Sequence, residues 1–228
     1  MPDMGKQQAG RPARRERGSI SAEEIIAGAL TLAEAEGLDA LSMPRLARAL
    51  GIGVTSIYWY FDNKDALIDA ITIAAARQLH DLITPPEAGP WQDRVEQLYC
   101  RMRDALRGND LLCDLLYMRG SRLGENALVH LWPEVELNLA KMTAAGLSSE
   151  AALRGLVALS LYTRGAVVLE RQMRRSGIDP ATPTPVTADF PLLSAAVEQQ
   201  NMRGVTDDAF RAQLRLLIDG LAALSAHR

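Results

Sequence analysis

The chain has 228 residues, of which 48% are hydrophobic, and its net charge is -3. This composition excludes a disordered chain and allows one large or two modest globular domains with their own cores. The N-terminal residues lack the apolar segment of a signal peptide, and no apolar run approaches membrane-spanning length, so we expect a soluble cytoplasmic protein with no membrane partner.

The first twenty residues are predicted to form a flexible basic arm. They hold five basic side chains against two acidic ones, namely Lys6, Arg11, Arg14, Arg15 and Arg17 against Asp3 and Glu16. Such an arm can reach into a minor groove beside a docked DNA-binding domain. A solubilising tail has the same composition, so both roles remain open.

The first predicted helix begins at Ser21. Ser21 and Glu24 have the spacing of a capping box, in which each side chain bonds the other residue's backbone amide. Apolar residues follow at helical spacing, namely Ile25, Ile26, Ala29, Leu30 and Ala33. Gly37 is predicted to end this helix.

Residues 42 to 64 have the pattern of a helix-turn-helix. Ser42 is positioned to cap a helix with Pro44 in its first turn, and Gly51 is positioned to end it. In the next helix Val54, Ile57 and Phe61 can turn inward. Hydroxyl and aromatic side chains stay outside, as in a recognition helix in a major groove: Thr55, Ser56, Tyr58, Trp59 and Tyr60.

The rest of the chain predicts further helices and no strands. A linking helix carries apolar residues from Leu67 and stops near Ile83, because Pro85 and Pro86 follow. Further helices are predicted over 91–107, 111–118, 126–145, 149–175, 192–202 and 207–226, with a proline-rich loop over 178–191. The fold class is therefore all-α.

Two of these helices, 149–175 and 207–226, are apolar on more faces than a single core needs. Such helices bury their excess apolar surface against a partner, so we predict a homodimer through a four-helix bundle. Glycines at 155, 165 and 220 would allow close approach of helix backbones.

Residues 21 to 70 resemble the DNA-binding domain of the tetracycline repressor (TetR) family. The resemblance rests on Ala-Leu-x-Leu-x-Glu-x-Glu-Gly, on Leu46-Ala47 with Leu50-Gly51, on Ile57-Tyr58-Trp59-Tyr60, and on Asn63-Lys64-x-Ala-Leu. By position it implies a recognition helix and a phosphate-binding lysine. The residues so implied are Val54, Thr55, Ser56, Tyr58, Trp59, Tyr60 and Lys64, and we add Ser42 and Arg45 to the predicted DNA-binding residues.

The second half is similar to the sensor domain of the tetracycline repressor, through Trp91-Gln92-Asp93, Gly146-Leu147-Ser148, Thr163 with Gly165, and Pro191-Leu192-Leu193. The family's magnesium-binding histidine falls near Leu116, which has no oxygen or nitrogen donor, so we expect no metal, no cofactor and no response to magnesium-tetracycline. An apolar effector pocket is expected instead. Its predicted residues are His80, Leu98, Met102, Leu116, Tyr117, Trp132, Leu161, Tyr162 and Glu170.

These observations predict three parts: the arm at 1–20, a helix-turn-helix domain at 21–66, and a ligand-sensing and dimerisation domain at 67–228. The predicted function is a homodimeric transcriptional repressor that leaves a palindromic operator when a small, largely apolar effector binds. A DNA-binding dimer whose second domain only dimerises or binds a protein is the alternative. No phosphate loop, nucleophile elbow or zinc motif indicates an enzyme, and the two cysteines form no disulfide framework.

Overall fold

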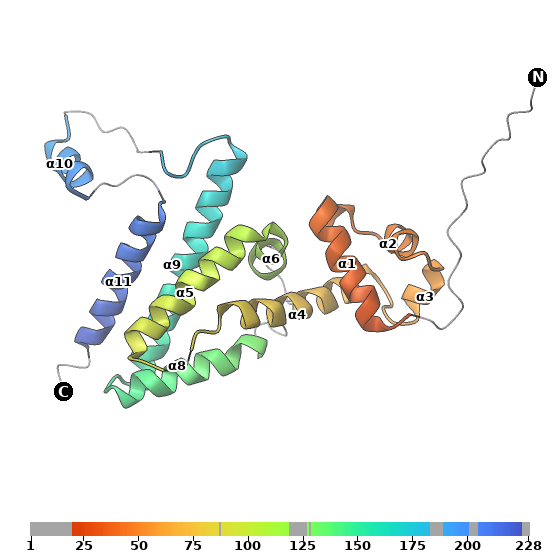
Figure 1. The fold of residues 1–228 in the computed structure, drawn as a ribbon, viewed down its shortest axis with the longest axis horizontal. Helices are drawn as coiled ribbons and strands as arrows, with labels where there is room; N and C mark the ends of the chain where they lie inside the picture. The colour runs from red at the N-terminus through yellow and green to blue at the C-terminus, as the bar shows by residue number, and fades with distance from the viewer. Residues whose placement is uncertain are drawn as a thin grey trace, which may run out of the picture. The chain divides into compact units, whose positions relative to one another are not determined.

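The computed structural model describes residues 20–86, 88–118, 127, 129–182, 189–200 and 205–224, and these residues contain helices and no strand (Figure 1). The chain divides into two compact units, Met1–Ala74 and Ala75–Arg228, called unit 1 and unit 2 below. The division falls inside helix α4, whereas the sequence placed it at 66/67. The predicted basic arm lies almost wholly outside the described residues.

Unit 1 contains α1 (Ala22–Glu36), a 3₁₀ turn η1 (Leu38–Ala40), α2 (Met43–Leu50), α3 (Val54–Tyr58) and the first half of α4 (Lys64–Ile83). The predicted capping box is present, since Ser21 Oγ accepts from the Glu24 amide at 3.2 Å and Glu24 Oε2 accepts from the Ser21 amide at 2.9 Å. Gly37 ends α1 with a positive φ of 84° that favours glycine. The core of unit 1 is apolar, as the pattern predicted.

Unit 2 begins with the second half of α4, which ends at Ile83 before the two prolines, and continues with α5 (Trp91–Gly108). The predicted helix over 111–118 is instead α6 (Asp110–Cys113) followed by the π-helical turn η2 (Asp114–Met118). The 3₁₀ turn η3 (Val129–Leu131) precedes α8 (Trp132–Ala144), so this helix starts later than the predicted residue 126. Residues 119–126 and 128 lie outside the description.

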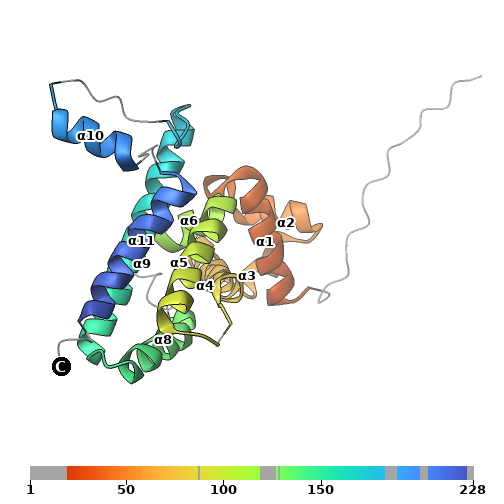
Figure 2. The same ribbon diagram turned by 60° about the vertical axis from the view of Figure 1, so that its left-hand side comes forward.

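The last three helices are α9 (Ser149–Arg175), α10 (Pro191–Gln200) and α11 (Asp207–Ala223). Ser148 caps α9, and Thr206 caps α11 as predicted. In both ribbon views α9 and α11 lie side by side, and α9 also packs on α5 and α8 (Figures 1 and 2). A Cβ at position 155 would lie 2.5 Å from the side chain of Leu221, which would have to shift, whereas the glycines at 165 and 220 have no such neighbour.

The expected excess apolar surface is present on α9 and α11. Its exposed members are Leu153, Val157, Leu161, Leu169, Leu216, Leu217 and Leu224. By length and mean hydropathy α9 could also cross a membrane, contrary to the expectation that no run reaches such length. Its inner face is nevertheless packed in unit 2, with Thr163, Glu170 and Arg171 buried.

Charged side chains join the helices of unit 2 inside its core. Arg94 on α5 pairs with Glu134 on α8 at 2.5 Å, and Arg103 on α5 pairs with Glu170 on α9 at 2.8 Å. The guanidinium of Arg171 donates hydrogen bonds to both carboxylate oxygens of Asp114, and these bonds raise the pKa of the guanidinium. Because a buried charge is costly without a partner, these pairs fix how the helices pack.

Candidate nucleic-acid interface and ligand cavity

The turn between α2 and α3 is built as the sequence predicted. Ser42 Oγ accepts a hydrogen bond from the Arg45 amide at 3.4 Å, which caps α2. Gly51 then adopts the left-handed conformation, with φ at 68°. Buried Ile57 and Phe61 hold α3 in place, so the opposite side of α3 is free to face solvent.

Large aromatic side chains lie at the end of α3 and in the turn after it, since α3 ends at Tyr58, whereas the sequence predicted that the recognition helix includes Trp59 and Tyr60. Trp59 is 86% exposed, and Tyr58 and Tyr60 are about half exposed. Thr55 is exposed beside them, while Val54 and Ser56 are partly buried. A tryptophan so exposed contributes little to a core, and we call the side formed by Thr55, Ser56, Tyr58 and Trp59 the reading surface.

Two of these predicted DNA-binding residues, Tyr60 and Arg45, also make contacts within unit 1, and a third, Lys64, begins a helix. The Tyr60 hydroxyl donates to the Ile20 carbonyl at 2.9 Å and so anchors the segment just before α1. Arg45 forms an ion pair with Glu36, although half of its side chain stays exposed. Lys64 is the first residue of α4, where free backbone amides and the helix dipole favour an anion such as phosphate.

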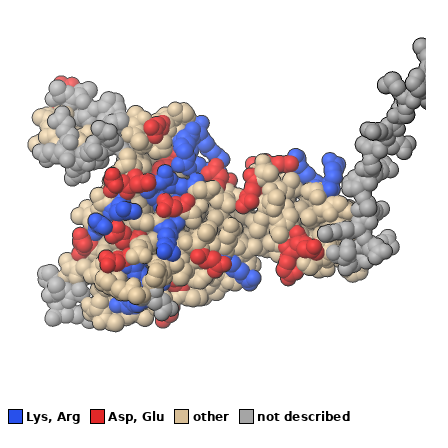
Figure 3. All heavy atoms as spheres, in the orientation of Figure 1, with Lys and Arg blue, Asp and Glu red and all other residues tan. Residues whose placement is uncertain are grey.

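Basic charge is scarce on the described part of unit 1. Residues 20–74 contain three basic side chains, Arg45, Arg48 and Lys64, against eight acidic ones. On the face drawn in Figure 3, basic and acidic side chains alternate over unit 2 without forming a basic surface. The described part of unit 1 therefore offers few cations for a phosphate, besides the backbone amides at helix starts.

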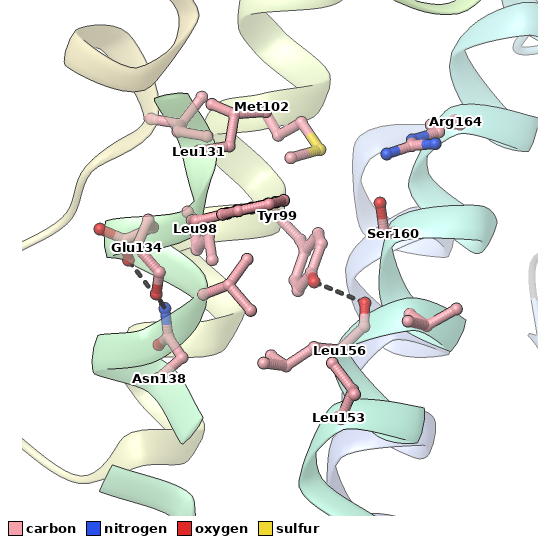
Figure 4. Close-up of a pocket in the computed structure, with 14 residues that line it drawn as sticks. Leu98, Tyr99, Met102, Leu131, Glu134, Asn138, Leu153, Leu156, Ser160 and Arg164 are labelled. Carbon is pink, nitrogen blue, oxygen red and sulfur yellow. Dashed lines mark hydrogen bonds between the residues drawn. The ribbon is translucent and has the colours of Figure 1, made fainter. Parts of the chain in front are cut away.

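A cavity of about 270 Å³ lies in unit 2 among α5, η3, α8 and α9, with Ile83 at the end of α4 also in its wall (Figure 4). Its wall is mostly apolar. Three of the nine predicted ligand-binding residues line it, namely Leu98, Met102 and Trp132. A mostly apolar cavity with a few polar groups is typical of small-molecule sites.

The other six predicted residues do not line this cavity, and as ligand contacts they stay predictions. Leu161 is exposed, and Tyr162 stacks on Phe210 with ring centroids 5.1 Å apart. Glu170 is buried among arginines. His80 lies on α4, Leu116 lies in η2, and Tyr117 packs under Arg164.

Several polar wall residues were not predicted as ligand contacts. The Glu134 carboxylate binds Arg94 and also accepts a 2.8 Å hydrogen bond from the side-chain Nδ2 of Asn138 (Figure 4). The Tyr99 hydroxyl donates to the Leu156 carbonyl at 2.7 Å, and burial raises the pKa of this phenol. Helical spacing places 153, 156, 157, 160 and 164 on one face of α9, but the pattern does not tell which face meets a cavity.

The donor set does not fit a bound magnesium ion. Within the described ranges no three His, Cys, Asp or Glu side chains converge on a point where a metal could bind. Leu116, at the position of the family's metal-binding histidine, offers only carbon atoms. Hard cations such as magnesium require oxygen ligands, so no metal-dependent step is assigned to this site.

Comparison with known proteins agrees with both halves of this description. Residues 25–71 match the family model for bacterial regulatory proteins of the tetR family, and residues 84–225 match the model for a tetracyclin repressor-like C-terminal domain. An HTH-type transcriptional repressor of Mycobacterium tuberculosis is 38% identical over 218 residues, covering 92% of this chain and 83% of that protein.

The class C tetracycline repressor protein of Escherichia coli is 30% identical, covering 89% of this chain and 90% of that protein. Among solved structures, the Streptomyces coelicolor protein ActR in complex with actinorhodin aligns with a TM-score of 0.66 and 27% identity, over 91% of this chain and 99% of that one. The similarity thus extends over both units.

Proposed function

This chain belongs to the tetR family of bacterial regulatory proteins, and from that premise we propose that it is a ligand-responsive transcriptional repressor. The observation that carries the proposal is the presence, in one chain, of an exposed reading surface on α3 and an apolar cavity at the far end of α4. Relatives named as repressors support the sign of regulation.

In the proposed complex, two copies of α3 lie in successive major grooves of a palindromic operator. The two-fold symmetry of a dimer permits half-sites about one helical turn, roughly 34 Å, apart. Thr55, Tyr58 and Trp59 contact base edges and backbone. Lys64 binds a phosphate at the start of α4.

The homodimer is proposed from the exposed apolar residues of α9 and α11. Four helices, two from each copy, would bury these surfaces and explain why so apolar a helix as α9 occurs in a protein that we propose to be cytoplasmic. Dimer formation also sets the distance between the two reading surfaces.

The proposed route from cavity to DNA runs through α4. Ile83, its last residue, lines the cavity, and the guanidinium of Arg94 donates 2.7 Å hydrogen bonds to the carbonyls of Pro85 and Pro86 just beyond it. Arg94 also binds Glu134 in the cavity wall. A ligand that moves this wall therefore acts on the end of the helix that starts with Lys64.

The coupling has a definite size limit. A ligand weakens DNA binding only by its differential affinity for the two conformations, typically about 1–3 kcal/mol. By linkage, DNA must weaken ligand binding by the same factor.

The test uses the full chain, a DNA duplex selected by the protein from a random pool, and a panel of apolar and aromatic compounds. A compound that raises the melting temperature should also weaken DNA binding. Met102→Trp should fill the cavity and abolish both effects, while leaving DNA binding without compound unchanged. If no compound that stabilises the protein affects DNA binding, the dimerisation-only alternative is the better description.

A further inference from the structure

The cavity wall contains one cation that has no counter-ion in the described part of the chain. Arg164, on α9, forms no ion pair there, and its Nε is buried without a hydrogen-bond partner. The other arginines that reach into the core of unit 2, Arg94, Arg103 and Arg171, each bind a carboxylate. Arg164 therefore differs from all of them.

The acidic residue in the same wall does not neutralise Arg164. Glu134 is already bound by Arg94 at 2.5 Å and by the Asn138 amide at 2.8 Å. The negative charge of Glu134 is thus neutralised by Arg94, which does not line the cavity. The positive charge of Arg164 is therefore not balanced by Glu134. Such a charge beside an apolar wall favours an anionic ligand over a neutral one.

The geometry holds Arg164 ready for a ligand. Its guanidinium carbon lies 4.3 Å from the centre of the Tyr117 ring, so the ring supports one face of the planar group. Figure 4 shows the guanidinium and the Ser160 hydroxyl one turn apart on the same side of α9, turned toward the space beside Tyr99 and Met102. A guanidinium and a hydroxyl together match the oxygens of a carboxylate.

We propose that the effector is a compact apolar acid, whose carboxylate binds Arg164 and Ser160 while its apolar body lies against Leu98, Met102 and Leu156. This inference rests on the proposed function, because it names the chemical class of the molecule that occupies the cavity. The volume of about 270 Å³ equals that of about nine water molecules at roughly 30 Å³ each, which a two-ring aromatic acid fills.

The test compares three probes of the same shape: 2-naphthoic acid, its neutral amide 2-naphthamide, and the cation of 2-(aminomethyl)naphthalene. Binding to the full-length protein is measured by calorimetry near pH 7.5. A charge-assisted hydrogen bond in an apolar site predicts that the acid binds about 10- to 100-fold more tightly than the amide. The cation should bind most weakly.

Variants of Arg164 locate the cause of this preference. Arg164→Gln should abolish the preference for the acid over the amide, and Arg164→Lys should retain part of this preference because the charge remains. Arg154→Gln is the matched control: Arg154 lies on the same helix, is 80% exposed, and pairs with Glu150 away from the cavity. It should leave all three affinities unchanged.

Equal binding of acid and amide, or a preference that survives in Arg164→Gln, would overturn the inference and leave the proposed function standing. No binding by any of the three probes at millimolar concentration would overturn it as well. A preference that depends on Arg164, with no effect of the bound acid on DNA affinity, would support the anion site and count against the proposed repressor mechanism.

Discussion

Replacement of Glu170 distinguishes a structural role from a ligand-binding role for this residue. Resemblance to the family suggested a ligand contact, yet the carboxylate is 1% exposed and lies between Arg103 at 2.8 Å and Arg107 at 3.0 Å. Glu170→Gln keeps the volume and removes the charge. The guanidinium of Arg103, itself only 3% exposed, then loses its buried counter-ion.

Removal of one partner from a buried ion pair typically costs about 3–5 kcal/mol. Arg103 would keep Asp207 and the face of the Phe210 ring, 4.5 Å from its guanidinium carbon, so we expect the lower end, about 3 kcal/mol. At about 2–4 °C per kcal/mol for a unit of this size, the melting temperature should fall by about 6–12 °C.

Thermal and urea denaturation of the full chain measure this loss, with Glu150→Gln as control. Glu150 lies on the same helix in an exposed pair with Arg154, so its replacement should cost less than about 1 kcal/mol. Compound binding by folded Glu170→Gln should equal that of the wild type. A variant of normal stability that has lost compound binding would refute this interpretation of Glu170.

Three further predictions concern DNA binding, the anchor of unit 1 and acid stability. Lys64→Ala should weaken DNA binding and reduce the slope of log Kd against log salt by about one, since one phosphate contact is lost; anisotropy titrations that find both unchanged would remove this role. Tyr60→Phe deletes the hydrogen bond to the Ile20 carbonyl and should destabilise unit 1 by about 1 kcal/mol in urea titrations, and an unchanged midpoint would contradict the anchor. Hydrogen bonds donated by Arg107 hold the pKa of Asp207 below its ordinary 3.8. The ionised carboxylate of Asp207 therefore stabilises the folded chain fully above pH 3.8, and this stabilisation is lost as the pH falls through the lower pKa of the folded state. Asp207→Asn should therefore flatten the acid denaturation curve below pH 4, and a curve of unchanged steepness would count against the pair.

Capping residues and helical spacing predicted most helices well, because these features depend only on residues close together in the sequence. Ser21 with Glu24, Gly51 and Thr206 all cap the helices that the pattern assigned to them. The less accurate region was 111–145, where a π-helical turn and a 3₁₀ turn interrupt the helical period. Such irregular turns arise from packing against other helices, which a local pattern does not contain.

The cavity was harder to predict than the reading surface for a physical reason. The reading surface lies on one short helix whose buried side is set by Ile57 and Phe61 nearby. The cavity wall combines residues from 83 to 164, and its polar character depends on which arginine meets which carboxylate. Arg94 and Glu134, whose pairing neutralises the acidic residue of the wall, are 40 positions apart, so the sequence alone did not identify this pair.

The most direct test of the central claim is the DNA that the protein selects. The full chain is incubated with a random pool of duplexes, and the bound fraction is amplified and sequenced over several rounds. A paired dimer with α3 as its reading element predicts an enriched palindrome with half-site centres about 10 base pairs apart, and loss of this enrichment in a folded Tyr58→Ala, Trp59→Ala variant. Absence of any enriched sequence, or the same enrichment in that variant, would contradict the claim that α3 reads DNA.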